Sequence, residues 1–117
     1  MGPGVPSLSL KVIMGVPKQS SECKIEAFRE VATMVAEKLT AVSGGLTWGF
    51  ANGTWALDNY IQHDLTVIYQ ILYLVEDEAR IFSVIRTDIP EAVREKELDI
   101  KHVRIEKGHV TGHHMKI

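Results

Sequence analysis

The segment from Leu65 to Val75 is a predicted strand with apolar side chains on both of its faces. Side chains alternate across a strand, so one face holds Leu65, Val67, Tyr69, Ile71, Tyr73 and Val75. The other face holds Thr66, Ile68, Gln70, Leu72 and Leu74. A two-layer protein buries one face of its sheet, and a second apolar face then needs a cover. A second copy of the chain is the simplest cover, which places Ile68, Gln70, Leu72 and Leu74 at a homodimer interface.

The segment from Glu22 to Val42 has the pattern of an amphipathic helix. Its apolar residues recur at every third or fourth position and draw one stripe along the helix. They are Ile25, Phe28, Ala32, Val35, Leu39 and Val42. Ser20 or Ser21 can cap the first turn by accepting hydrogen bonds from free backbone N–H groups. Gly44 and Gly45 follow the last turn, where glycine accepts the left-handed conformation of a helix exit.

The regions on either side of this helix predict strands. Residues 1–6 are rich in proline and glycine and indicate a loose terminus. Residues 7–14 alternate as a half-buried strand does. After the helix, Asn52-Gly53 favours a tight hairpin, although residues 46–57 could instead form one long bent strand. Gly49 would then mark a bulge or the close approach of another backbone.

The region from residue 76 to 97 fits two structures. It could pair as a strand with the segment before it, or it could be helical, because its apolar residues also keep helical spacing. These residues are Phe82, Ile85, Ile89 and Val93. In the helical alternative, Pro90 either kinks the helix or begins its second half with Asp88 as the cap.

The order of the elements predicts the fold class. Residues 100–106 form a last strand with Val103 and Ile105 inward, and residues 108–117 form a polar, His-rich tail. The chain therefore reads strand, helix, strand or hairpin, strand, helix, strand, in a single domain over residues 1–117. Two βαβ halves of this kind give an α+β, ferredoxin-like two-layer sandwich with an antiparallel sheet and two helices on one face.

Charge and composition exclude several classes of function. The chain has 117 residues, a net charge of -2 and no basic block, so nucleic-acid binding has no electrostatic support. Its apolar runs are too short for a membrane span. A single cysteine, Cys23, excludes an internal disulfide and agrees with a reducing compartment. We therefore expect a cytoplasmic protein that binds neither nucleic acid nor membrane.

The stretch GGLTWGFANGTW, residues 44–55, resembles a pattern in small uncharacterised bacterial proteins. The shared features are Gly44-Gly45-x-Thr47, Gly53-x-Trp55 and an acidic residue, Asp64, that opens a long apolar strand. Those proteins often lie on mobile or accessory genes, and the resemblance implies a ferredoxin-like fold with a helix within residues 76–97. Pro90 departs from the pattern because it falls in that helix. The resemblance implies no particular activity.

The same stretch suggests a ligand site beside the sheet. Glycine lets backbone amides approach a small molecule. The cleft would be lined by Thr47, Trp48, Thr54, Trp55, His63, Tyr69 and Tyr73. The alternative is structural, with the glycines ending the helix and both tryptophans anchoring the strands that follow. We favour the structural interpretation, because large aromatic side chains ordinarily belong to a core or an interface.

Other chemical candidates have simpler explanations. Asp58, His63 and Asp64 could supply an acid–base pair, but a polar turn accounts for them. His109 and His113 have the spacing of metal ligands on a helix, yet the residues between them are poor helix formers. The sequence therefore predicts no catalytic residue, no metal ligand and no cofactor.

Two functions stay open at this point. The first is a non-enzymatic, homodimeric binding or interaction module, favoured by the doubly apolar strand and the missing catalytic constellation. The alternative is a small-molecule-binding protein or enzyme, with a pocket between the Gly-Thr-Trp segment and the open sheet face. A closed, dry sheet face would favour the first function, and a polar-lined pocket would favour the second.

Overall fold

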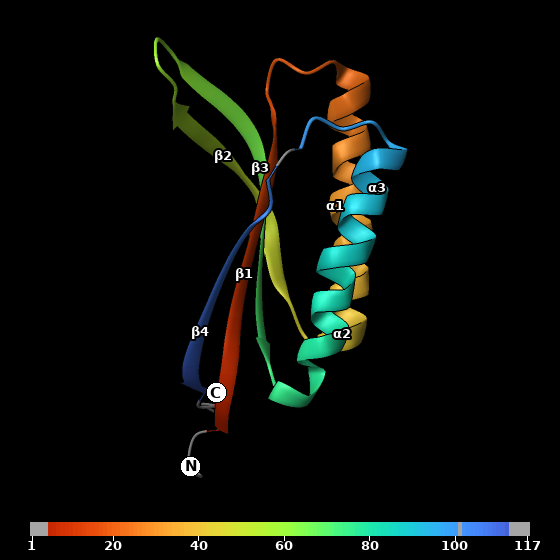
Figure 1. The fold of residues 1–117 in the computed structure, drawn as a ribbon, viewed down its shortest axis with the longest axis vertical. Coiled ribbons are helices and arrows are strands. Elements are labelled where there is room, and N and C mark those ends of the chain that lie inside the picture. Colours follow the sequence, from red (N-terminus) through yellow and green to blue (C-terminus); the bar gives the residue numbers. More distant parts are fainter. Residues whose placement is uncertain (1–4, 101, 113–117) are drawn as a thin grey trace, which may run out of the picture.

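The computed structural model describes residues 5–100 and 102–112 as one sheet layer and one helical layer (Figure 1). The strands are β1 (Val5–Pro17), β2 (Thr47–Ala56), β3 (Ile61–Tyr73) and β4 (Arg104–Gly112). The helices are α1 (Glu22–Ser43), α2 (Glu78–Ser83) and α3 (Ile89–Glu95), with a 3-10 turn at Val75–Asp77 and a π-helical segment at Val84–Asp88.

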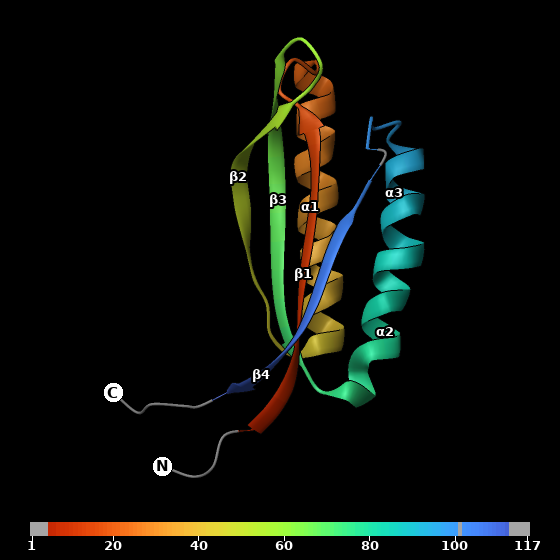
Figure 2. The same ribbon diagram turned by 60° about the vertical axis from the view of Figure 1, so that its left-hand side comes forward.

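The strands form an antiparallel sheet in the order β2-β3-β1-β4. The register sets Leu10 of β1 opposite Ile71, and Trp48 of β2 opposite Tyr69. The helices lie against one face of this sheet, as both views show (Figure 1, Figure 2). Within the described ranges no helix covers the other face, which we call the open face. This topology confirms the predicted ferredoxin-like α+β sandwich.

The core lies between the sheet and the helices. The sheet contributes alternate residues, namely Leu10, Val12, Met14 and Val16 from β1 and Val67, Tyr69, Ile71 and Tyr73 from β3. The helices contribute Phe28, Val31, Ala32, Val35, Ala36, Leu39, Ile81, Val84, Ile85, Ile89 and Ala92. The predicted inner face of β3 is therefore confirmed except at Val75, which lies past the end of the strand and is exposed.

α1 begins and ends where the sequence predicts. Ser21 Oγ accepts a hydrogen bond from the Lys24 backbone N–H across 3.3 Å. Gly44 ends the helix in the left-handed conformation, with a φ of 83°. Although α1 is long, no helix in the described part of the chain is both long and apolar enough to cross a membrane.

β2 is one long strand, which was one of the two predicted alternatives. Residues 47–56 all pair with β3, and Asn52 lies opposite Leu65 inside that ladder. The chain reverses later, where the Leu57 backbone N–H donates to the Tyr60 carbonyl across 2.9 Å. The Asn52-Gly53 turn signal is overridden, because tertiary pairing with a long apolar strand outweighs the preference of two residues.

The region from residue 76 to 97 is helical. α2, the π-helical segment and α3 follow one another without a break. Pro90 lies in the first turn of α3, directly after the π-helical segment, and it cannot donate a backbone hydrogen bond to the turn before it. Asp88 makes no capping hydrogen bond with its side chain. Its carboxylate instead lies 3.4 Å from Lys38 Nζ on α1.

The sheet is longer at its terminal end than the sequence predicts. Val5 and Pro6, expected in a loose terminus, lie in β1 opposite Gly112 and Thr111. Residues 108–112, expected in a polar tail, belong to β4 for the same reason. Pairing gives backbone groups of both segments a hydrogen-bonding partner, which polar composition alone does not reveal. The remaining parts of the predicted termini, 1–4 and 113–117, lie outside the described residues.

β4 begins later than the predicted strand 100–106, at Arg104. Val103 packs against the core, as predicted. Ile105 lies opposite Val12 on the helix side but is 40% exposed, so it is not part of the core.

Gly44→Ala should lower the free energy of unfolding by about 1 kcal/mol, because an L side chain is disfavoured in the left-handed region. Gly45→Ala is the matched control, since Gly45 has no positive φ and a Cβ there would meet nothing within 4 Å. Urea denaturation followed by circular dichroism measures both variants. Equal losses in the two variants would contradict the assigned cap.

Candidate functional site

The open face carries rows of side chains that the strand registers set side by side. Two rows lie toward the β2–β3 hairpin, Gly53–Asp64–Pro17 and Ala51–Thr66–Gly15. Two further rows lie toward the termini, Gly49–Ile68–Ile13–Arg104 and Thr47–Gln70–Lys11–Glu106. We call the two ends of the face the hairpin end and the terminal end.

A hollow of about 600 Å³ opens at the hairpin end of the open face. Gly15 and Thr66 belong to its floor, Trp55 lines it from β2, and Arg104 lines it from β4. The β2–β3 hairpin, which marks this end of the face, lies at the upper left in Figure 1. Its lining mixes an indole and aliphatic side chains with carboxylates, an amide, a hydroxyl and a guanidinium, which suits a small molecule with both apolar and polar parts.

Two glycines leave room for the Thr66 side chain, which lines the hollow. A Cβ at Gly53 would lie 2.6 Å from Thr66 Oγ1. A Cβ at Gly15 would lie 3.0 Å from the same oxygen and 2.9 Å from the Leu65 carbonyl oxygen. Distances under 3.0 Å are closer than real Cβ contacts. Glycine on the strands at both sides of β3 therefore lets the Thr66 side chain lie where it does.

Trp55 forms a wall of the hollow. Its indole Nε1 lies 3.6 Å from the position that a Gly53 Cβ would take. The side chain is 48% exposed and lies on the open face. This corrects the prediction that both tryptophans anchor the strands against the helix. Trp48 and Trp55 are an odd number of positions apart in one strand, so they point to opposite faces of the sheet.

Trp48 does pack on the helix side, as predicted. Its ring stacks on Tyr69 with centroids 5.9 Å apart and planes at 21°. It also meets Phe50 edge to face at 5.7 Å. Phe50 in turn lies 6.2 Å from Phe28 of α1. This aromatic group anchors the edge strand β2 to the core.

Asp64 is the only charged side chain that is buried within the described part of the chain, with 9% of its surface exposed. Its Oδ1 accepts a hydrogen bond from Gln62 Nε2 across 2.9 Å. Its Oδ2 and the Thr66 hydroxyl make no hydrogen bond with the described residues. No fully buried polar side-chain atom there lacks a partner, so both of these oxygens are reachable from the hollow.

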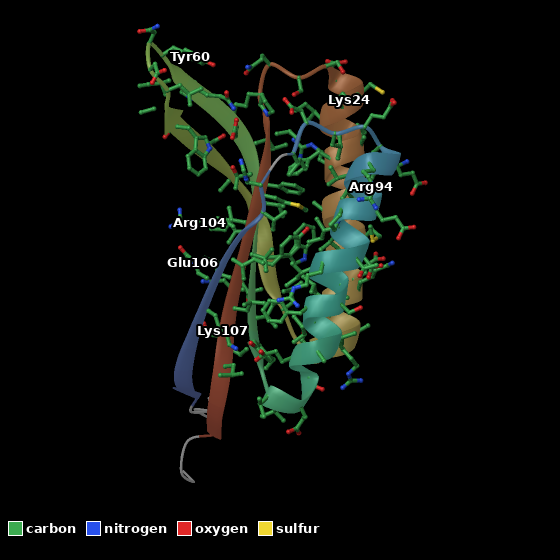
Figure 3. The ribbon with its side chains drawn as sticks, in the orientation of Figure 1. Lys24, Tyr60, Arg94, Arg104, Glu106 and Lys107 are labelled. Atoms are coloured by element: carbon green, nitrogen blue, oxygen red, sulfur yellow. The ribbon has the colours of Figure 1, made fainter. Side chains whose placement is uncertain are left out.

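Charged side chains border the hollow on the β4 side. Arg104 and Glu106 project from β4 away from the helices (Figure 3). Arg104 Nη2 lies 3.0 Å from Glu106 Oε1, and Lys11 Nζ lies 4.0 Å from Glu106 Oε2. The charge of Arg104 is therefore already matched by a neighbouring carboxylate.

The predicted ligand-binding residues do not meet in one site. Thr47 and Trp55 lie on the open face, toward opposite ends of β2, and only Trp55 lines the hollow. Trp48, Thr54 and His63 lie on the helix side, and Tyr69 and Tyr73 are in the core. The strict alternation of β2 and β3 separates them.

Both buried tyrosines use their hydroxyls inside the protein. Tyr69 donates to the Ala32 carbonyl across 2.7 Å, and Tyr73 donates to Glu78 Oε2 across 3.1 Å. Burial raises the pKa of Tyr69 above its ordinary value. Burial, then the hydrogen bond to Glu78 and its charge, raise the pKa of Tyr73 to about 12. Both hydroxyls stay protonated near neutral pH and act as donors in the core.

The other chemical candidates do not assemble into sites. His63 and Asp64 are consecutive in β3, so their side chains point to opposite faces. Cys23 is exposed. The described residues contain no group of three His, Cys, Asp or Glu side chains that could hold a metal ion. Of the two histidines with metal-ligand spacing, His109 and His113, the second lies outside those residues.

Much of the lining of the hollow was missed by sequence reasoning, namely Gly15, Gln62, Asp99, His102 and Arg104. Gly15 carried a usable signal, because glycine next to an alternating strand indicates a close approach. Asp99 and His102, which precede β4, and Arg104 in β4 had no sequence feature that indicated a place in the hollow. Their position at the hollow follows from the strand order, which brings the last strand beside the first.

The comparisons with known proteins support the fold. No family model matches the chain, and no curated protein matches it in sequence. Among solved structures, a PII-like signaling protein from Thermus thermophilus is similar, with a TM-score of 0.53, 12% identity and coverage of 94% of this chain and 93% of that one. At this identity, the similarity shows a shared fold.

Two further structures are similar over most of their length. CutA from Synechococcus elongatus PCC7942 has a TM-score of 0.49, 13% identity and coverage of 93% of this chain and 80% of that one. CutA1 from Oryza sativa has a TM-score of 0.45, 16% identity and coverage of 95% and 85%.

Gly53→Ala should destabilise the protein by about 1–3 kcal/mol, because the new methyl group would collide with Thr66 Oγ1 and force the floor to shift. Gly49→Ala is the control in the same strand and on the same face, where a Cβ meets nothing within 4 Å. Urea denaturation compares the two. A Gly53→Ala protein as stable as the control would show that glycine does not fix the floor.

Proposed function

We propose that this protein is a non-enzymatic binding module that works as a homodimer, with the terminal end of the open face as the subunit interface. The observation that carries the proposal is Leu72, which is 59% exposed on a sheet face that the helices leave uncovered. Ile68 lies on the same face of β3, and Gln70 lies between it and Leu72. Leu74, which is 43% exposed, directly follows the last residue of the strand.

A second copy of the chain is the occupant that this surface fits best. Burying each aliphatic side chain contributes roughly 1.5–3 kcal/mol. A two-fold interface sets a residue near the axis against its own copy. Gln70 has both a donor and an acceptor, so two copies can pair with each other across such an axis.

The fold similarity is compatible with this role. The similar structure from Thermus thermophilus is described as a signaling protein, and signaling can operate through binding alone. That support is an analogy at the level of the fold, and the exposed aliphatic residues carry the argument.

Leu72→Lys should convert the dimer to a monomer at micromolar concentration, because a buried ammonium would lie unpaired in the interface. Analytical ultracentrifugation measures this. Ile61→Lys is the matched control, since Ile61 is in the same strand, is 63% exposed and lies at the hairpin end. A monomeric wild type would refute the proposal. Dissociation by Ile61→Lys alone would move the interface to the hairpin.

The second candidate function is binding of a small molecule in the hollow. The observation that favours it is the built floor, where Gly15 and Gly53 make room for the Thr66 hydroxyl beside the buried Asp64 carboxylate. Leu72 lies toward the terminal end of the open face, whereas Ile68 lies beside Ile13, which lines the hollow. A dimer centred on Leu72 would leave the Asp64 and Trp55 side of the hollow reachable.

Trp55→Ala should lower the free energy of unfolding by only about 1–2 kcal/mol, below the range for a tryptophan buried in a core. The half-exposed position of the ring is the reason. The same change should remove any small molecule that native mass spectrometry detects on the purified protein. Trp48→Ala is the control on the opposite face and should leave such a molecule bound. A loss above about 3 kcal/mol would mean that Trp55 belongs to the core.

A further inference from the structure

We propose that the hollow at the hairpin end binds an organic cation, a protonated amine carried on a flat apolar body. The Asp64 carboxylate supplies the counter-charge and the Trp55 indole supplies the wall. The inference rests on the second candidate function, small-molecule binding in this hollow, and names the chemical class of the ligand.

The Asp64 carboxylate lacks a compensating charge. Its hydrogen-bond donor is the neutral amide of Gln62, and it forms no ion pair with the described residues. A charge that is withdrawn from water is unfavourable unless it is paired. With 9% of the residue exposed, the free Oδ2 can meet solvent or a ligand only through the hollow. A cation at this position would form an ion pair with the Asp64 carboxylate and donate a hydrogen bond to Oδ2.

The atoms around Oδ2 match the donors of an ammonium group. Asp64 and Thr66 are two positions apart in β3, so both side chains lie on the open face. The Thr66 hydroxyl oxygen accepts no hydrogen bond from the described residues. An ammonium group has three N–H donors and no acceptor. It can therefore donate to the carboxylate and to the hydroxyl at the same time.

The apolar part of the lining favours an organic cation over a bare metal ion. Trp55, Leu57 and Ile13 line the hollow together with Asp64. An indole face attracts an ammonium group and also stacks on a flat apolar body. A metal ion needs several oxygen, nitrogen or sulfur ligands. The described residues contain no group of three His, Cys, Asp or Glu side chains that could hold one.

The charges in the lining disfavour an anion. Asp64 and Asp99 both line the hollow and would repel it. Arg104 is the guanidinium in the lining, and it already lies 3.0 Å from a Glu106 carboxylate oxygen. The local balance of charge therefore favours a ligand that brings a positive charge.

Titration with three probes of similar shape tests the inference. The probes are 2-phenylethylamine, the neutral 2-phenylethanol and the anionic 3-phenylpropionate, followed by ¹H–¹⁵N NMR of the full chain. We expect the amine to shift the indole N–H signal of Trp55 in a saturable way, at least tenfold more tightly than the alcohol. The propionate should give no saturable shift. The Trp48 indole signal, on the opposite face, should stay in place.

Asp64→Asn should remove the preference for the amine over the alcohol, and Asp58→Asn should keep it, because Asp58 is exposed in the hairpin turn outside the hollow. The probe comparison uses the wild-type chain, so it holds even if Asp64→Asn does not fold. Equal binding of the alcohol or the propionate at Trp55 would overturn the cationic class and leave the binding hollow standing. No saturable shift with any probe would overturn both.

Discussion

The hydrogen bond from the Tyr69 hydroxyl to the Ala32 carbonyl ties the middle of the sheet to the middle of α1 across 2.7 Å. A buried hydroxyl must find a partner, so Tyr69 has to face the helix. Because side chains alternate, the orientation of Tyr69 determines the face to which every other β3 side chain points. Val67 and Ile71 point inward, and Leu72 points outward. A slip of one residue would turn every side chain over. The composition of the open face is thus a consequence of the core.

The two ends of the open face differ in polarity, and the residues of β1 and β2 that lie beside β3 determine this difference. At the hairpin end, the residues beside Asp64 and Thr66 include Gly53 and Gly15, so the sheet is bare and polar. At the terminal end, β3 presents Leu72, whose aliphatic side chain is 59% exposed. One end is therefore suited to hold a small molecule and the other to pack against protein.

The features that the sequence predicts correctly rest on long periodic patterns. The stripe of α1, the inner face of β3 and the order of the elements each extend over many residues, so no single preference can overturn them. Asn52-Gly53 suggested a turn that does not form, because the preference of two residues is weaker than the pairing of the whole strand with β3. Most residues of the hollow could not be predicted from the sequence, since Trp55 and Arg104 line the same hollow only because of the strand order. Trp55 was found because it stands beside Gly53.

The combination of glycine and tryptophan in β2 has a structural explanation. Gly53 and Trp55 share a face, so the indole can lie over a position without a side chain. Glycine weakens an edge strand, which has a partner on one side only. Trp48 and Phe50 offset that loss on the other face, where they stack on Tyr69 and meet Phe28. One face of β2 therefore holds the strand in place, and the other is free to form the hollow.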